Sequence, residues 1–559
     1  METDPLETIA RQANKSHPTA KWLASWREAI ADYSPEEVRA WCRLRIEAPE
    51  ETPEALGAVF GIAEVASAGT ATQLGAWALQ WHKSGRLALA GAAITALGAI
   101  AVQPDRAMAN EAIGQLQRLK TRLRHRTLTR RIDEALKAVA NTRGLSAEAL
   151  QDLVVEDAGL ESNGQRCWEA GPYQLYLFLS DDGAVTLTIF DVANGRALAN
   201  PPKALKQDHY RVLAEIKAVQ KVLTETLATQ KARLEQAMID GRSWRYADWR
   251  EVFGPHPLMR HLAQRLVWRI DDVDAAATEG ALVPLSGDGR AFSDDASVRV
   301  AHPAEAREEA LAAWRLWVIQ ARRVQPFKQA FREIYAPREE DAPYYTERFA
   351  GTSVRHIQLY ALLRARGWQG LSGIGPNGYV GERKLEARGV TAVLGFRPHG
   401  QQRDRQRRLV DLERLEFYPI PLPEWQPGHE SRLPLGEVDM VAFSEAVRDV
   451  ALVVGQARAQ DDASAVAVRA SLFKALLPQL GLENKVTIDG GQAWIPARRE
   501  RFRLDLANGK VSLEDGRSLD LSGFERIDTP LYLPHEAKDQ PTMEILSTLL
   551  WLAQLAQRM

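Results

Sequence analysis

The chain reads WREVFGPHPLMRHLAQRLVWRI at residues 249–270, SVRVAHPAEA at 297–306 and WRLWVIQARRVQPFKQAFREIY at 314–335. These three segments set apolar runs rich in Trp, Leu and Val between His-Pro, Gln-Pro-Phe and Arg-Glu elements. Apolar runs of helix and strand length, separated by proline and glycine, are typical of a folded α+β unit. They predict a central domain over residues 242–420.

The prolines of this block predict where its helices begin and end. Pro303 stands where a helix starts, so we expect a helix over residues 304–323. The Gln325-Pro326 pair breaks or kinks that helix before residues 327–335, which we interpret as a further short helix.

The region before this block predicts two further domains. Residues 1–150 are rich in Ala and Leu, with helix breaks at points such as Ser34-Pro35, and they predict a helical solenoid-like domain of HEAT type. Residues 87–102 are uncharged but short for a bilayer span, so we expect a buried helix and no membrane association. Residues 151–241 predict a β-meander, with a turn at Asn194-Gly195, followed by a long helix that Gly241 ends.

The last region, residues 436–559, predicts a β-rich domain with a terminal helix. It follows a proline-rich stretch that we interpret as a linker. We expect a strand over residues 438–443, with Ser444 as the N-cap of the next helix. Short strands then alternate with turns, of which Asn508-Gly509 is a strong hairpin signal. The fold class is therefore multidomain α+β, with an N-terminal α-solenoid region.

From about residue 165 to residue 559, the order of these motifs resembles a bacterial family of domains of unknown function that includes the molybdate metabolism regulator-like (MolR-like) proteins. The quoted Trp249–Tyr335 block carries most of the resemblance, and the C-terminal hairpin, Leu-Pro element and closing helix extend it. The resemblance implies no particular activity and no cofactor.

Composition sets limits on function. A chain of 559 residues is longer than one hydrophobic core usually supports, so several domains are expected. Its content of 45% hydrophobic and 26% charged residues is ordinary for a folded soluble protein. The net charge of −2 gives no global attraction to nucleic acid or membrane. Two distant cysteines, Cys42 and Cys167, and an N-terminus without a signal pattern indicate a reducing cytoplasm. Because no Cys/His cluster occurs, we expect neither a metal nor another cofactor.

A polar group around the Gln325-Pro326 break forms the candidate site. Its side chains offer amides, a guanidinium, a carboxylate, a phenol and an imidazole. Such a set can hold a phosphate or a carboxylate, or it can form an internal network, and the usual mutual satisfaction of buried polar groups favours the network. The candidate residues are His302, Gln325, Gln329, Arg332, Glu333 and Tyr335.

Two further motifs bear on function. Residues 373–378, GIGPNG, match a glycine-rich phosphate loop literally, but no parallel strand precedes them and a proline replaces a needed amide, so we interpret them as an exposed turn. Basic runs occur near residues 118–131, 403–408 and 498–503 and can attract phosphates. They can equally be solvated faces and strand edges. The candidate phosphate contacts are Arg122, Arg124 and Arg126.

The sequence thus identifies no specific function. We interpret the protein as a cytoplasmic interaction or scaffold component with protein partners. An enzyme with a site around residues 325–335 is one alternative, although no catalytic motif supports it. A nucleic-acid-binding protein that uses the basic runs is the other, and the slightly acidic net charge does not favour it.

Overall fold

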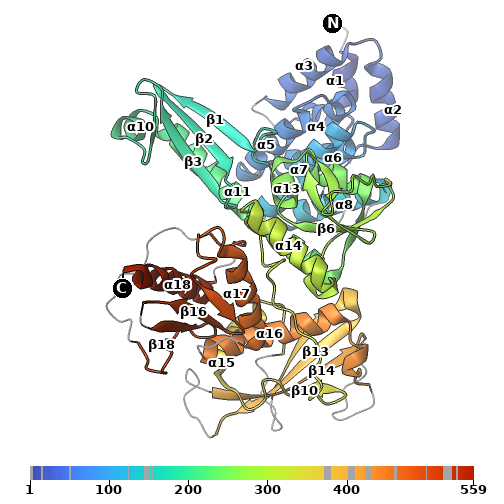
Figure 1. Cartoon of the computed structure of the whole chain (residues 1–559). Helices are drawn as coiled ribbons and strands as arrows, with labels where there is room; N and C mark the ends of the chain where they lie inside the picture. The colour runs from blue at the N-terminus through green and yellow to red at the C-terminus, as the bar shows by residue number, and fades with distance from the viewer. Residues whose placement is uncertain are drawn as a thin grey trace. The chain divides into compact units, whose positions relative to one another are not determined.

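The computed structural model forms two compact units, residues 1–158 and residues 159–559, shown in Figure 1. It describes the chain apart from residues 1–3, 14–16, 49–51, 124, 144–151, 153–154, 156, 371–378, 401–408, 422–430, 459–461, 499, 520–531, 537–538 and 559. The glycine-rich turn 373–378, the 403–408 basic run and half of the proline-rich linker, residues 422–430, therefore lie outside the described residues. The predicted domain borders within each unit stay predictions.

The first unit is helical throughout its described part. Its elements are α1 Pro5–Ala10, α2 Ala20–Ala29, α3 Pro35–Ile46, α4 Pro53–Gly61, the 3-10 turn η1 Ile62–Val65, α5 Thr70–Lys83, α6 Leu87–Ala101, α7 Arg106–Arg122 and α8 Arg126–Arg143. The expected break at Ser34-Pro35 is confirmed as a helix start, because Ser34 and Glu37 form a reciprocal capping box. The helical composition of the region is therefore confirmed.

Small residues allow the helices of this unit to approach closely. A side chain added at Gly57 would lie 2.4 Å from the carbonyl oxygen of Ala10, so α4 and α1 touch there through backbone. Helix α6 is buried along most of its length and contacts α5, α7 and α8, which confirms the expected buried helix. No helix among the described residues is long and apolar enough to cross a membrane.

The second unit begins with the predicted meander. Strands β1 Gln165–Ala170, β2 Tyr173–Leu179, β3 Val185–Asp191 and β4 Arg196–Leu198 pair antiparallel in sequence order. The short helix α10 Lys203–Asp208 leads into α11 Tyr210–Asp240, which runs along the meander in Figure 1. Leu175 and Ile189 of the sheet pack with Ile216 of α11, and Gly241 ends the helix at φ 68°.

A five-stranded antiparallel sheet follows, in the order β5-β9-β6-β7-β8. Trp268 of this sheet packs edge-on against Trp249 and Phe253, whose rings stack on each other. The elements of this part are β5 Ser243–Arg245, α12 Tyr246–Phe253, α13 Pro257–Ala263, β6 Val267–Ile270, β7 Val273–Thr278, β8 Ala281–Pro284, β9 Ser297–Val300, η2 Pro303–Glu305 and α14 Glu308–Gln320.

The next part contains a second antiparallel sheet, in the order β10-β14-β13-β12, with β11 also paired to β14. Helix α16 packs against β11 and β13 of this sheet. The elements are β10 Tyr345–Thr346, β11 Ser353–Arg355, α15 His356–Arg364, β12 Tyr379–Leu385, η3 Glu386–Arg388, β13 Val390–Pro398, β14 Leu409–Pro419, η4 Leu435–Glu437 and α16 Met440–Arg458.

The last part is a β-meander packed against helices. The Asn508-Gly509 turn joins β17 to β18 as expected. Trp314 and Phe331 belong to the same hydrophobic core as this sheet and α18, so the C-terminal part shares its core with the Trp249–Tyr335 block. The elements are α17 Ala463–Leu476, β15 Thr487–Asp489, β16 Gln492–Pro496, β17 Arg501–Asp505, β18 Val511–Leu513 and α18 Gln540–Arg558.

Two local expectations are wrong. Residues 327–335, all of which the structure describes, form turns and irregular backbone instead of a helix. Residues 438–443 form no strand, because Asp439 caps α16 by accepting a hydrogen bond from the Ala442 amide. Helix α16 is buried on several sides, and such a helix has a continuous apolar run that sequence alone does not distinguish from a strand.

Candidate functional site

The irregular segment 325–335 begins with hydrogen bonds to residues 534–536 rather than with helical hydrogen bonds. The Gln325 amide donates to the Pro534 carbonyl, and the Gln325 carbonyl accepts from the Glu536 amide, as in a short parallel bridge. These bonds occupy backbone groups that a helix would have paired within itself. Tertiary contacts therefore override the helical preference of the sequence.

The two predicted glutamines complete the backbone hydrogen bonding of this region. Gln329 accepts from the Val267 amide at 2.9 Å and donates to the carbonyls of Val267 and Ala301 at 2.7 and 2.8 Å. Gln325 donates to the side-chain oxygen of Gln329 and accepts from the Ala330 amide. Both side chains are buried and hydrogen-bonded, so they take the place of backbone groups as partners for the surrounding amides and carbonyls.

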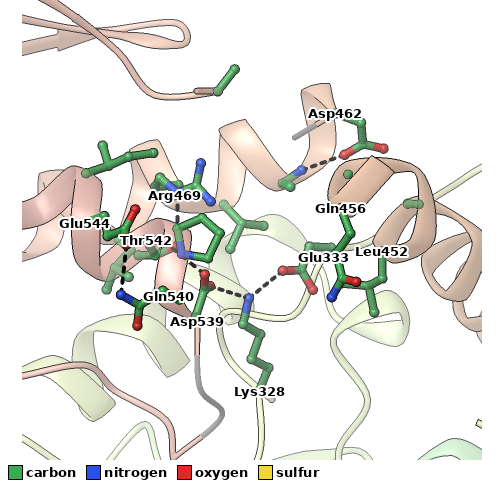
Figure 2. A pocket seen from close by; sticks show the side chains of 18 of the residues that line it. Lys328, Glu333, Leu452, Gln456, Asp462, Arg469, Asp539, Gln540, Thr542 and Glu544 are labelled. Atoms are coloured by element: carbon green, nitrogen blue, oxygen red, sulfur yellow. Dashed lines mark hydrogen bonds and ion pairs between the residues drawn. The ribbon is translucent and has the colours of Figure 1, made fainter. Parts of the chain in front are cut away.

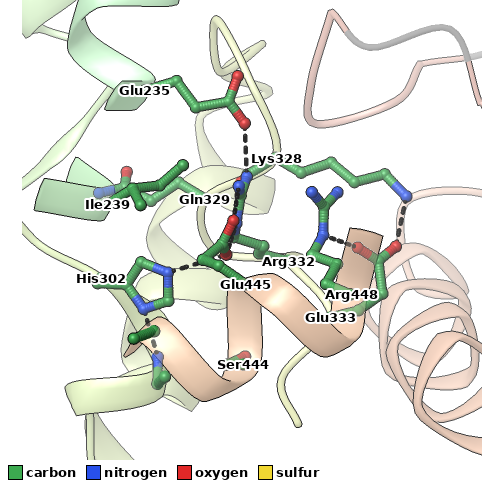
Figure 3. A network of polar contacts seen from close by, with 12 residues as sticks. Glu235, Ile239, His302, Lys328, Gln329, Arg332, Glu333, Ser444, Glu445 and Arg448 are labelled. Atoms are coloured by element: carbon green, nitrogen blue, oxygen red, sulfur yellow. Dashed lines mark hydrogen bonds and ion pairs between the residues drawn. The ribbon is translucent and has the colours of Figure 1, made fainter. Parts of the chain in front are cut away.

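Arg332 and His302 meet on one buried carboxylate, Glu445 of α16 (Figure 3). Arg332 binds Glu445 with two parallel hydrogen bonds of 2.6 and 2.7 Å, and its remaining amino group reaches Glu235 of α11 at 2.7 Å. The His302 Nε2 lies 3.2 Å from Glu445, and its Nδ1 accepts the Ala304 amide at 3.1 Å. The side chains of Arg332 and Glu445 are 2% and 1% exposed.

Glu333 points to the other side of the segment, toward a second set of charges in Figure 3. Its two oxygens accept from Lys328 Nζ at 2.7 Å and from Arg448 Nε at 2.8 Å. Lys328 also binds Asp539, next to the start of α18, at 2.7 Å. The chain of ion pairs thus connects α16, the 325–335 segment and α18.

Tyr335 ends the segment, joined to α16 and to the start of α17. Its hydroxyl donates to Asp462, the N-cap of α17, at 3.1 Å. Its amide donates to Ser444 Oγ at 3.0 Å, so Ser444 lies inside α16 and serves the neighbouring backbone. The expectation that Ser444 caps a helix is therefore wrong.

The pKa values of these groups follow from burial and pairing. Burial raises the pKa of Glu445, but the facing Arg332 guanidinium outweighs that effect and holds the pKa well below its ordinary value. Glu333 behaves in the same way between Arg448 and Lys328. Burial lowers the pKa of His302, so the imidazole is neutral, in agreement with an Nδ1 that accepts a hydrogen bond. The network is thus built from ions held in their charged forms around one neutral histidine.

Sequence reasoning missed a second buried cluster, one helical turn further along α16. Asp449 accepts from Trp368 Nε1 at 2.7 Å and from Arg383 at 2.5 Å, and Arg366 Nε lies 3.3 Å away. Burial raises the pKa of Asp449, although Arg383 and Trp368 oppose the shift. The available signal was the four-residue spacing of two acids, Glu445 and Asp449, within an apolar run.

A cavity of about 940 Å³ lies beside this network. Figure 2 shows Lys328, Glu333 and Asp539 along it, with Leu452 and Gln456 of α16 nearby. The predicted residues Glu333 and Tyr335 line it, whereas His302, Gln325, Gln329 and Arg332 do not. A volume of this size is in the range of small-molecule sites.

Two residues of the first basic run have acidic neighbours. In the first run, Lys120 pairs with Asp133 of α8 at 2.8 Å, and Arg130 lies 3.6 Å from Glu134. Of its candidate phosphate contacts, Arg122 and Arg126 are exposed, and Arg124 lies outside the described residues. Within the described residues, no group of three or more His, Cys, Asp and Glu side chains is placed to hold a metal ion.

Comparison with known proteins finds that two stretches of the second unit are similar to domains of unknown function. Residues 195–368 match the family model of a Domain of unknown function (DUF4132), and residues 466–557 match that of a second Domain of unknown function (DUF7737). The chain is similar to an uncharacterized protein, YehI, of Escherichia coli (strain K12), with 27% identity over 314 residues. The match covers 54% of this chain and 25% of that relative, so the chain spans about a quarter of the relative's length. No solved structure matches the chain.

Proposed function

We propose that the chain is a cytoplasmic interaction or scaffold component that binds protein partners rather than a catalyst. The observation that carries the proposal is the mutual satisfaction of the predicted site. Each of its six residues is buried and bonded to groups of the second unit. Catalysis needs a group that can reach substrate in a reactive protonation state. Glu333 and Tyr335 line the neighbouring cavity, but Lys328 and Arg448 hold the Glu333 carboxylate and the Tyr335 hydroxyl donates to Asp462.

The helical first unit supports partner binding. Helices in series offer extended surfaces when they stack as a solenoid, and we propose a HEAT-like solenoid arrangement for this unit. Leu44 on α3 is 70% exposed, and Tyr33 and Leu87 are also exposed, so apolar side chains are available on its surface. We further propose that the chain is related to the MolR-like proteins, on the order of motifs in the sequence.

Site-specific photo-crosslinking in living bacteria tests the interaction proposal. A photoreactive phenylalanine analogue replaces Leu44, Tyr33 or Leu87 in the full chain, and Val283 of β8 serves as an exposed control position. We expect discrete adducts of reproducible mass from the first-unit positions and none from Val283. The interaction proposal is wrong if no first-unit position gives a discrete adduct.

A further inference from the structure

Arg448 brings unused hydrogen-bond donors to the wall of the cavity. It projects from α16, and its Nε donates to Glu333 at 2.8 Å. Its two terminal amino groups bond none of the residues that the structure describes, and Figure 3 shows them beyond the bonded Nε. A guanidinium carries five N–H groups in a planar fork that matches an oxyanion. As far as the described residues go, four of those N–H groups therefore remain for a ligand.

Arg366, which follows α15, contributes a second guanidinium to the same cavity. Its Nε faces Asp449 at 3.3 Å and one terminal nitrogen donates to the Leu362 carbonyl at 3.0 Å. The other terminal nitrogen bonds no described residue. Burial lowers the pKa of Arg366, and the positive charge of Arg448 adds to this effect while Asp449 opposes it. A bound anion between the two arginines would reduce their mutual repulsion.

The carboxylates that line the cavity already have donors. Glu333 is held by Lys328 and Arg448, and Asp539 accepts from Lys328 and from the Thr542 amide. Asp462 accepts from the Tyr335 hydroxyl and from the Ala465 amide, and Glu544 accepts from the side-chain amide of Gln540. The cavity therefore offers free donors on two arginines beside carboxylates that are already engaged, which favours an anionic ligand over a cationic one.

The remaining wall is suited to an apolar body. Phe331, Leu452, Val468, Leu472 and Trp551 line the cavity together with the two arginines. Ligand sites combine such apolar lining with a few polar groups that fix orientation, and 940 Å³ accommodates a molecule with one or two rings.

We propose that the cavity binds a small molecule with an oxyanion group, a carboxylate or phosphate, held by Arg366 and Arg448, and an apolar body packed against the adjoining wall. This site goes beyond the proposed scaffold function and does not depend on it. A scaffold that carries such a site can be controlled by a metabolite.

Two fluorescent probes with nearly the same aromatic body test the proposal on the full chain. Anilinonaphthalene sulfonate carries an oxyanion, and N-phenylnaphthylamine is its uncharged counterpart. We expect saturable binding of the sulfonate, and Arg366→Gln or Arg448→Gln should raise its Kd about ten- to hundredfold, as for the loss of one charge-assisted hydrogen bond. The Kd of the neutral probe should stay unchanged in Arg366→Gln.

Arg364→Gln is the matched control, because Arg364 is exposed on α15 and does not line the cavity. It should leave both Kd values unchanged. Thermal melting of each variant confirms that the fold persists, and Arg366→Gln alone decides the test if Arg448→Gln unfolds. Absence of saturable sulfonate binding by the wild-type chain, or equal sulfonate affinity in wild type and Arg366→Gln, overturns the proposal.

Discussion

Arg332 shows why a buried guanidinium needs all its partners. It pairs with Glu445 through two hydrogen bonds and with Glu235 through a third, while both Arg332 and Glu445 are almost fully enclosed. Removing one member of a buried pair leaves an uncompensated charge in a medium that solvates it poorly. The energetic importance of Arg332 therefore lies in the cost of leaving Glu445 alone.

Arg332→Ala should lower the free energy of unfolding by about 3–5 kcal/mol, the usual cost of breaking a buried ion pair. The double variant Arg332→Met with Glu445→Met should recover more than half of that loss, because no buried charge remains at either position. Urea denaturation measures both values. Arg517→Ala is the control, since Arg517 is 68% exposed and pairs only with the exposed Asp515 and Glu500 among the described residues, and such surface pairs contribute little to stability. Equal losses in the single and double variants would contradict this account.

His302 gives the network a pH dependence of defined sign. The folded pKa of His302 lies below the ordinary 6.5, mainly because of burial, so between the two values the unfolded chain binds a proton that the folded chain does not. The stability contributed by His302 is therefore complete above pH 6.5 and decreases as the pH falls below it, by at most about 1.4 kcal/mol per pH unit.

The variant His302→Gln tests this linkage. Glutamine does not take up a proton, so the difference in unfolding free energy between wild type and His302→Gln should shrink from pH 7.5 to pH 5.5. Between pH 7.5 and 8.5 the difference should be constant, which serves as the internal control. Parallel stability curves over the whole range would show that His302 is not the titrating group.

At the scale of elements, the segment 325–335 is stabilised by side chains that replace backbone partners. Gln329→Leu keeps a similar volume but removes the hydrogen bonds of Gln329 to the Val267 amide and to the Ala301 carbonyl, whereas the Val267 carbonyl keeps its bond from the Ala301 amide. We expect a loss of at least about 1–3 kcal/mol, the cost of one unsatisfied buried group. Chemical denaturation checks it, with Gln320→Leu as the control because Gln320 is exposed at the end of α14. Equal stability of the two variants would be incompatible with this role.

The elements that sequence predicted are those with local signals. Ser34 caps α3 and Gly241 ends α11, each through an interaction within a few residues. The two failures, residues 327–335 and 438–443, depend on distant partners or on burial from several sides. A local pattern carries no information about a backbone bond from Gln325 to Pro534, which is more than two hundred residues away.

The same distinction applies to the candidate site. The sequence identified Arg332 and Glu333 as polar residues of interest, and the preference for an internal network agrees with their contacts. It did not identify Glu445, Arg448 or Asp539 as their partners, because these lie on α16 and before α18. Nor did it identify the cavity, whose wall combines residues from five separate stretches of the second unit.

At the scale of the whole molecule, the first unit contains a core of its own. Its buried residues, from Leu6 to Ala140, form one hydrophobic cluster. Helix α6 is the centre of that cluster, because it carries no charged residue and is covered by α5, α7 and α8. A unit with such a core should fold without the rest of the chain.

The fragment 1–158 should therefore be soluble, strongly helical by circular dichroism and cooperative in thermal melting. The shorter fragment 1–101 is the matched comparison, because it lacks α7 and α8 and so exposes the uncharged surface of α6 to solvent. We expect this shorter fragment to aggregate, since a contiguous exposed apolar surface promotes association. A disordered 1–158 fragment would show that the first unit needs the second one to fold. A 1–101 fragment that is soluble and melts cooperatively would instead show that the helices before α7 form an independently folding core.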